Sequence, residues 1–307
     1  MHPPVFVSYS RCQGEWVWNR LVPVLRAGGA EILIDRERFV AARAVYTQMD
    51  EVQDRAELQI LVLSPDYLAS KPCQHEMKRA IARDPKFELG ITVPVMRIDC
   101  TLPPSIKRPD PLIVDLRDES MPEPWDSLLH TCRLDLGVDA PEWLHAHDAV
   151  HRYLSRGQSV NLIVTGQVRW RPLLEHLRED PALGLGMVKL DAIEAMHRPS
   201  LVQQILKQCG CPAPGPVPGK PEDLVMLGRV LKALPRAPRL ALTSFDHVSH
   251  RLGEYEVDLF VALRDLMMDA RKLVLLVESR APFATLLPHG HPLSEIQLVN
   301  VELKGRP

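Results

Sequence analysis

The 307-residue chain is long enough for two domains, each with its own apolar core. Its composition, 46% apolar and 25% charged, is typical of a globular protein, and a formal net charge of −2 gives no electrostatic reason to predict nucleic acid or a membrane as a direct partner. No apolar run approaches the ~18 residues of a membrane-spanning helix and Met1 leads straight into a predicted strand, so we expect a cytoplasmic protein without a signal peptide, its cysteines reduced.

Strands and helices alternate over residues 1–135. Apolar runs predict strands over 5–10, 31–35, 58–63, 92–98 and 112–116. Helical spacing of apolar residues predicts helices over 14–26, 47–55, 72–83 and 122–132, and the polar residues after the third strand predict a turn before 72. Such alternation is typical of an α/β fold with a parallel sheet and helices on both faces.

Ligands of parallel sheets bind outside the carboxyl ends of the strands. We therefore expect one edge of this sheet to be lined by residues that end strands or follow them directly, namely Ser8, Tyr9, Ser10, Arg11, Asp35, Arg36 and Ser64. Glu76, in the first turns of the helix after the third strand, should lie beside them.

Three residues at or near this edge also have a purely structural explanation. The helix dipole favours an acidic residue near a helix start, where Pro72 also fits, so Glu76 needs no function to be placed there. Asp35 is equally explained as a turn former and Phe6 as a core residue. Residue spacing alone favours a structural role for Glu76.

Three segments together resemble the Toll/interleukin-1 receptor (TIR) domain. They are Phe6-Val7-Ser8-Tyr9-Ser10, Leu33-Ile34-Asp35 and Ser64-Pro65-Asp66-Tyr67-Leu68-x-Ser70-x-x-Cys73-x-x-Glu76. The resemblance implies a flavodoxin-like five-stranded parallel sheet over residues 1–135. For the enzymatic members it further implies cleavage of NAD⁺, as substrate and not cofactor, at the nicotinamide–ribose bond, with Glu76 catalytic and no metal. The substrate-binding residues it implies are Phe6, Ser8, Tyr9, Arg11, Asp35, Arg36 and Cys73.

The chemistry of this reaction is compatible with a single carboxylate. Nicotinamide in NAD⁺ is a cationic leaving group, so its departure needs no general acid. One carboxylate beside the ribose can hold its hydroxyls and stabilise an oxocarbenium-like centre, which is half of the carboxylate pair of a glycosidase.

Two positions depart from the family pattern. The loop after the second strand has Ala41-Ala42 where the family usually has Pro-Gly, and Pro72 stands where a tryptophan usually precedes the cysteine. We expect the first change to affect self-association through that loop and the second to remove a packing residue beside Cys73. Neither change touches the carboxylate of Glu76.

Residues 136–307 begin a second α/β alternation. Strands are predicted over 160–166, 186–190, 239–246, 272–280 and 296–303, and helices over 141–155, 171–178, 199–209, 223–234 and 257–268. This order resembles a P-loop NTPase of the AAA or STAND kind. Asp246 would then stand at the position of a Mg²⁺-binding carboxylate and Arg280 in the sensor segment.

The phosphate loop itself is missing from this second domain. A loop of the form Gly-x-x-x-x-Gly-Lys-Ser/Thr is required, whereas the chain reads Gly166-Gln167-Val168-Arg169-Trp170-Arg171-Pro172. Trp170 and Pro172 would obstruct the cradle of backbone N–H groups that binds phosphate. We therefore predict a degenerate domain that does not hydrolyse nucleotide.

Together these features predict an NAD⁺ hydrolase, or an ADP-ribosyl cyclase, that acts as an immune effector of the prokaryotic type. We expect homo-oligomers formed through TIR–TIR contacts, and activation by a sensor protein bound through residues 136–307. The alternative is a non-catalytic TIR adaptor that signals by homotypic contacts. Cys209 with Cys211, and Cys73 with His75, lack the further ligands of a zinc site, so no metal is predicted.

Overall fold

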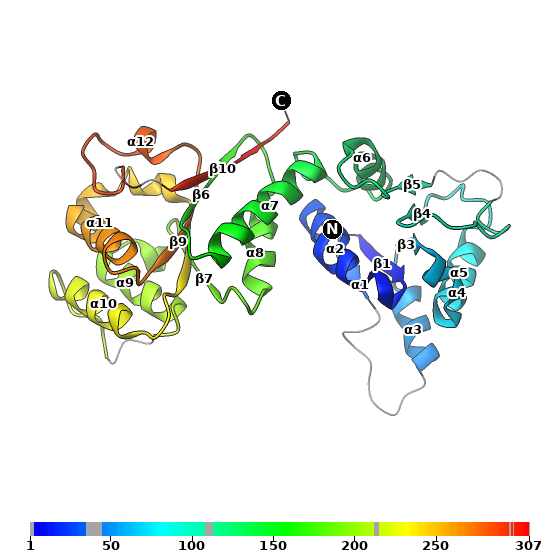
Figure 1. Ribbon diagram of the computed structural model, residues 1–307, viewed down its shortest axis with the longest axis horizontal. Coiled ribbons are helices and arrows are strands. Elements are labelled where there is room, and N and C mark those ends of the chain that lie inside the picture. The colour runs from blue at the N-terminus through cyan, green and yellow to red at the C-terminus, as the bar shows by residue number, and fades with distance from the viewer. Residues whose placement is uncertain are drawn as a thin grey trace. The chain divides into compact units, whose positions relative to one another are not determined.

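The computed structural model describes residues 3–34, 45–107, 113–211, 215–294, 296 and 298–306. The chain divides into two compact units, residues 1–144 (unit 1) and 145–307 (unit 2), each built on its own sheet (Figure 1). The predicted division lies nearby, at residue 135. No helix in the described part of the chain combines the length and the hydropathy that a bilayer-spanning segment requires.

The sheet of unit 1 has five parallel strands in the order β2-β1-β3-β4-β5. They are β1 (Pro4–Tyr9), β2 (Glu31–Leu33), β3 (Leu58–Leu63), β4 (Thr92–Met96) and β5 (Val114–Asp115). Every residue of β3 is buried, because the strand is central and helices cover both faces of the sheet. The fold predicted for this part of the sequence is confirmed.

Helices lie on both sides of this sheet (Figure 1). They are η1 (Arg11–Gln13), α1 (Gly14–Trp16), η2 (Val17–Leu21), α2 (Val22–Gly28), α3 (Val45–Asp54), α4 (Pro65–Ala69), α5 (Lys71–Arg83) and α6 (Pro122–Thr131). Trp16 of α1 stacks on Trp125 of α6, with ring centroids 6.4 Å apart, so these two helices share one face. On the other face α5 packs against β1 and β4, and α3 packs against α5.

The predicted turn after β3 is wrong, because residues Pro65–Ala69 form the short helix α4. Ser64 caps this helix by accepting a hydrogen bond from the N–H of Tyr67 at 3.1 Å, and Pro65 occupies its first turn. Ser70 then caps α5 in the same way, with Pro72 in the first turn. Two caps in succession turn the chain sharply twice and fix the start of the helix that carries Glu76.

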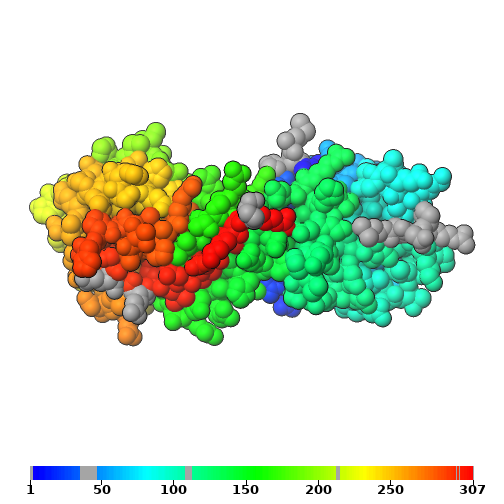
Figure 2. All heavy atoms as spheres, turned by 90° about the horizontal axis from the view of Figure 1, so that it is seen from above, coloured from blue at the N-terminus to red at the C-terminus, as the bar shows by residue number. Residues whose placement is uncertain are grey.

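Unit 2 has a second sheet of five parallel strands, in the order β10-β6-β9-β8-β7. They are β6 (Val160–Thr165), β7 (Leu185–Lys189), β8 (Arg239–Thr243), β9 (Val274–Ser279) and β10 (Val299–Lys304). The edge strand β10 exposes alternate residues and lies at the surface of this unit, in red in Figure 2. The predicted strand 239–246 ends early, at Thr243, because Ser244 adopts a left-handed backbone conformation with φ 58°.

The helices of unit 2 surround a large apolar core. The chain enters it along α7 (Ala140–Ser155), followed by α8 (Arg171–Glu179), η4 (Ile193–Ala195), α9 (Arg198–Gln208), α10 (Glu222–Ala233), η5 (Phe245–Val248), α11 (Leu252–Met268) and α12 (Phe283–Leu286). Side chains of α9, α10 and α11 pack into one cluster with those of β7, β8 and β9. Helix α11 begins before its predicted start at 257, and the kink at Glu256 explains why the periodicity marks only its second part.

Gly186 marks a close approach between β7 and the end of α9. A β-carbon at this glycine would lie 2.3 Å from the carbonyl oxygen of Gln208. We expect Gly186→Ala to lower the free energy of unfolding of unit 2 by about 2–3 kcal/mol, because backbone would have to move. Denaturant unfolding of the full chain measures this. The matched control is Gly228→Ala in α10, where the added methyl meets nothing within 4 Å. A control that destabilises equally would contradict the steric explanation, since Ala in a helix favours folding by about 0.5–1 kcal/mol.

Candidate functional site

Glu76 lies in the second turn of α5, at the carboxyl edge of the unit 1 sheet, and its side chain is only 5% exposed. Because α5 packs against β1, its inner face meets the end of that strand, where Ser8 lies. The Ser8 hydroxyl donates a hydrogen bond to Oε2 of Glu76. Ser8 Oγ also lies 2.8 Å from the phenol oxygen of Tyr67, on α4. The strand, the short helix and α5 thus bring three polar side chains together in a buried place.

The direction of these hydrogen bonds follows from proton counting. A serine hydroxyl has one proton, and Ser8 gives it to the Glu76 carboxylate. Tyr67 is therefore the donor in its hydrogen bond with Ser8. Burial raises the pKa of Tyr67 well above its usual value, and the nearby Glu76 charge raises it further against the opposing effect of the Ser8 hydrogen bond. The phenol therefore keeps its proton and remains a donor at neutral pH.

The backbone of Glu76 is fixed from a second side, by α3. Gln53, fully buried on that helix, donates from Nε2 to the Glu76 carbonyl oxygen at 2.9 Å. One turn earlier on α3, the Asp50 carboxylate lies 2.9 Å from Nε2 of His75 and 3.1 Å from Nε of Arg79. Helix α5 is therefore held by polar contacts to α3 as well as by its apolar packing on the sheet.

Three of the predicted substrate-binding residues are buried, and Ser8, described above, is the first of them. Phe6 is 1% exposed and belongs to an apolar cluster with Leu33 and Ala56. Cys73 is 6% exposed, and its thiol donates to the carbonyl oxygen of Tyr9 at 3.5 Å. In the described residues Phe6 thus fills the core beneath the edge of the sheet, and Cys73 connects α5 to the end of β1.

Tyr9 and Arg11 are more accessible. Tyr9 is half-buried, and its phenol oxygen accepts a hydrogen bond from the indole N–H of Trp18 at 3.0 Å. Arg11 is exposed in η1, directly after β1. The remaining predictions at this edge fall outside the described residues and concern Asp35, Arg36, Ala41 and Ala42.

Reasoning from the sequence missed two residues of this network, Tyr67 and Gln53. Tyr67 stands inside the third TIR-like segment, and the capping pattern at Ser64 and Pro65 was a signal for the helix that carries it. Gln53 has no comparable signal, because a buried glutamine on a mostly polar helix resembles a surface residue in sequence.

At the carboxyl edge of the unit 2 sheet, the turn after β6 is covered by the chain itself. Gly305, just past β10, donates its N–H to the carbonyl oxygen of Thr165 at 2.8 Å. A β-carbon on Gly166 would lie 3.2 Å from Cα of Gly305. The backbone after β6, which would form a phosphate cradle, is thus in contact with Gly305 in the segment that follows β10 (the closing segment).

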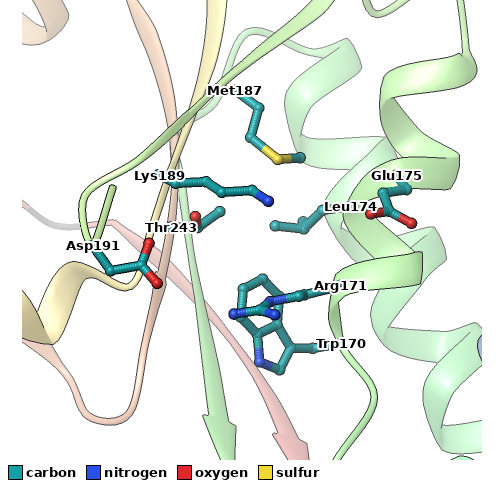
Figure 3. Close-up of a pocket in the computed structure, with 8 residues that line it drawn as sticks. All are labelled: Trp170, Arg171, Leu174, Glu175, Met187, Lys189, Asp191 and Thr243. Atoms are coloured by element: carbon teal, nitrogen blue, oxygen red, sulfur yellow. The ribbon is translucent and has the colours of Figure 1, made fainter. Parts of the chain in front are cut away.

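A small pocket opens beside the start of α8 (Figure 3). The Arg171 guanidinium stacks over the Trp170 ring at 5.4 Å, and Lys189 reaches in from the end of β7. The full lining comprises Trp170, Arg171, Leu174, Glu175, Met187, Lys189, Asp191 and Thr243. Its enclosed part has room for about one water molecule, far less than a nucleotide needs. Among the described residues no group of three or more His, Cys, Asp or Glu is arranged to hold a metal ion.

Glu278, at the end of β9, is a buried acid that should make stability depend on pH. Its carboxylate accepts the Ser244 N–H at 2.7 Å, yet burial, reinforced by the Asp246 charge, raises its pKa. The folded state then binds this proton more tightly than the unfolded chain, whose glutamate titrates near 4.3. The free energy of unfolding should therefore fall as the pH rises from about 4.3 through the raised value.

In Glu278→Gln this loss should disappear. Urea unfolding at a series of pH values measures it, with the exposed Glu194→Gln as the matched control. The same pH slope in wild type and Glu278→Gln would contradict the assignment.

Comparison with known proteins identifies unit 1. Residues 5–129 match the family model described as "TIR domain". Over 72 residues the chain is 31% identical to Toll-like receptor 6 of Bos taurus and to Toll-like receptor 1 of Homo sapiens. Each match covers 24% of this chain and only 9% of the receptor, so the chain spans a small part of these relatives. Unit 1 contains a TIR domain, and the resemblance predicted from the sequence is confirmed.

Solved structures similar to the chain fall into two groups. The TIR domain of the Toll-related receptor TRR-2 from Hydra magnipapillata covers 42% of this chain and 97% of its own, at 20% identity and a TM-score of 0.37. The match to the ORC1 protein of Aeropyrum pernix, in complex with DNA, covers 53% of this chain and 44% of the ORC1 chain, at 18% identity and a TM-score of 0.39. The match to a Walker-type ATPase of Pyrococcus abyssi covers 52% of each of the two chains, at 13% identity and a TM-score of 0.37. The ORC1 protein and the Walker-type ATPase are neighbours of the C-terminal part of the chain.

Proposed function

We propose that this chain is an NAD⁺ nucleosidase and that Glu76 carries the reaction. The observation that supports this best is the buried arrangement at the carboxyl edge of the TIR sheet, where the Ser8 hydroxyl donates to the Glu76 carboxylate. A hydrogen bond donated to a carboxylate favours its ionised form, which is the form the reaction needs. Residues 5–129 match the TIR domain family, and for the enzymatic members of that family the resemblance implies cleavage of NAD⁺ with a catalytic glutamate at the position of Glu76.

In the proposed reaction the bond between C1′ of the ribose and the nicotinamide nitrogen breaks, and nicotinamide leaves as a neutral molecule with the bonding electron pair. The Glu76 carboxylate binds the ribose hydroxyls and stabilises the positive charge that develops on the ring. Water then adds to C1′ and releases a proton, which gives ADP-ribose. An attack by a nitrogen of the same molecule would give a cyclic product instead.

The proposal extends to an effector role in immunity, in the cytoplasm, with activity controlled by assembly. Homotypic TIR contacts would bring copies together, and residues 136–307 would bind the partner that triggers assembly. Contact between the closing segment and the turn after β6 argues against nucleotide hydrolysis as the trigger. The net charge of −2 gives no reason to propose direct nucleic-acid binding.

A non-catalytic adaptor is the second candidate. The curated relatives with the matching segment are receptors by name, and the carboxylate of Glu76 is almost completely enclosed. In this reading Glu76 is a structural residue of the sheet edge, and the TIR domain acts by binding other TIR domains.

Nicotinamide release separates the two candidates. The purified full chain is incubated with NAD⁺ over a wide range of protein concentrations, while sedimentation monitors its assembly. The nucleosidase proposal expects nicotinamide, with a rate per molecule that rises as the chain assembles. Strong self-association without any loss of NAD⁺ would establish the adaptor instead.

A further inference from the structure

Three buried side chains from three different elements form one hydrogen-bonded line. Ser8 on β1, Tyr67 on α4 and Glu76 on α5 are 1%, 0% and 5% exposed. The phenol donates to the serine hydroxyl over 2.8 Å, and the serine hydroxyl donates to Oε2 of the carboxylate. The outer member of the line, Tyr67, is distant in sequence from Ser8, and the reaction proposed above does not use it.

The line has a property that simple core packing does not need. A buried tyrosine requires a partner for its hydroxyl, and a backbone carbonyl oxygen would be sufficient. Here the partner is the hydroxyl that itself binds the carboxylate. By donating to Ser8 Oγ, the phenol polarises the Ser8 O–H and obliges its proton to point toward Glu76. Loss of the phenol would free Ser8 to turn its proton elsewhere.

We propose that Tyr67 is a positioning residue that acts through Ser8 to fix the Glu76 carboxylate in one rotamer and in its ionised form. Ser8 is thereby a positioning residue too, and not a group that contacts NAD⁺. The catalytic consequence rests on the proposed function, whereas the effect on the carboxyl group does not depend on it.

The other ionisable groups near this line are either paired with residues outside it or, in the case of Cys73, close enough to act on it electrostatically. Cys73, one turn before Glu76, contributes to the electrostatic environment of Tyr67. On α3, which packs against α5, Asp50 is paired with His75 and Asp54 is paired with Arg79 at 2.6 Å. The variants below leave these groups in place, so a change in the titration of Glu76 reports on the line itself.

The test is a pH titration of the Glu76 carboxyl group by NMR. The full chain is labelled with ¹³C at the glutamate carboxyls, and the Glu76 signal is assigned by its absence in Glu76→Gln. We expect Ser8→Ala to raise the pKa of Glu76 by about one unit, because the charged form loses a hydrogen bond. Tyr67→Phe, which keeps the ring and its packing, should raise it by a smaller amount.

The same variants give a kinetic readout. Tyr67→Phe should lower the kcat for nicotinamide release by about tenfold with little change in KM, and should move the acidic limb of the pH–rate profile upward. Thr92→Val is the matched control, because it removes a different buried hydroxyl hydrogen bond to α5, to the Ala80 carbonyl oxygen at 3.1 Å. It should change neither the titration nor the kinetics.

The outcomes are distinguishable. An unchanged pKa of Glu76 in both Ser8→Ala and Tyr67→Phe overturns the proposal, and if one variant does not fold the other decides. A raised pKa with an unchanged kcat overturns its catalytic part. A raised pKa of Glu76 in the variants, together with a wild-type chain that releases no nicotinamide, supports the positioning line and rejects the nucleosidase.

Discussion

Glu76→Gln is expected to lower the rate of nicotinamide release from NAD⁺ by at least about 10³-fold, while the TIR domain stays folded. The change removes the negative charge that would stabilise the oxocarbenium-like ribose, and nothing else in the proposed reaction replaces that charge. Glutamine has nearly the same shape, and its carbonyl oxygen can still accept the Ser8 hydrogen bond. The loss should therefore lie in kcat, with a small effect on thermal stability.

Glu57→Gln serves as the matched control. Glu57 is exposed and directly precedes β3, at the opposite edge of the same sheet, so the same chemical change there should leave the rate untouched. Nicotinamide is measured by chromatography under conditions in which the wild-type chain assembles. Equal rates in wild type and Glu76→Gln would remove Glu76 from the reaction even if the chain consumes NAD⁺.

Asp223→Asn is expected to destabilise unit 2 by about 3–5 kcal/mol. Arg198, the first residue of α9, is fully buried, and its guanidinium binds both carboxylate oxygens of the equally buried Asp223, at 2.8 and 3.0 Å. The remaining nitrogen of the guanidinium, Nη1, donates to the carboxylate of Glu256 at 2.6 Å, at the kink of α11. Loss of the Asp223 charge leaves the arginine without its fully buried counter-charge.

Two further variants define this second effect. Glu222→Gln changes an exposed acidic residue next to Asp223 in the first turn of α10, and should cost less than about 1 kcal/mol. The double variant Arg198→Met with Asp223→Leu should recover much of the loss, because it removes both buried charges. Urea unfolding of the full chain measures all three. A double variant less stable than Asp223→Asn would contradict the argument from the uncompensated charge.

The sequence predicts the strands of both sheets well because buried parallel strands are continuous apolar runs. Leu58–Leu63 is the clearest case, since its predicted and observed bounds coincide. The errors arise where a boundary depends on contacts distant in sequence. Strand β8 stops at Thr243 because the N–H of the following Ser244 turns to donate to Glu278, a residue on the neighbouring strand. Helix α4 was missed because five residues are too few to show a period.

The geometry of a parallel sheet was sufficient to predict which residues of the candidate site lie close together. The carboxyl ends of neighbouring strands meet at one edge, so the proximity of Ser8 to Glu76 follows from the order of elements. The hydrogen-bond partners of Ser8 and Glu76 do not follow from the order of elements. That the Ser8 hydroxyl binds the carboxylate, and that Tyr67 supports it from α4, depends on side-chain directions that no spacing in the sequence encodes.

The strand order of unit 2 also has a consequence for how this chain folds during synthesis. Strand β6 is translated first in its sheet, yet its two neighbours, β9 and β10, are translated last. The second sheet therefore stays incomplete until almost the whole unit has left the ribosome, and its closure joins segments more than a hundred residues apart, which is slow. The first sheet needs nothing beyond β5, at Val114–Asp115. We thus expect each newly made molecule to pass through a period in which the TIR domain is folded while the rest of the chain is not.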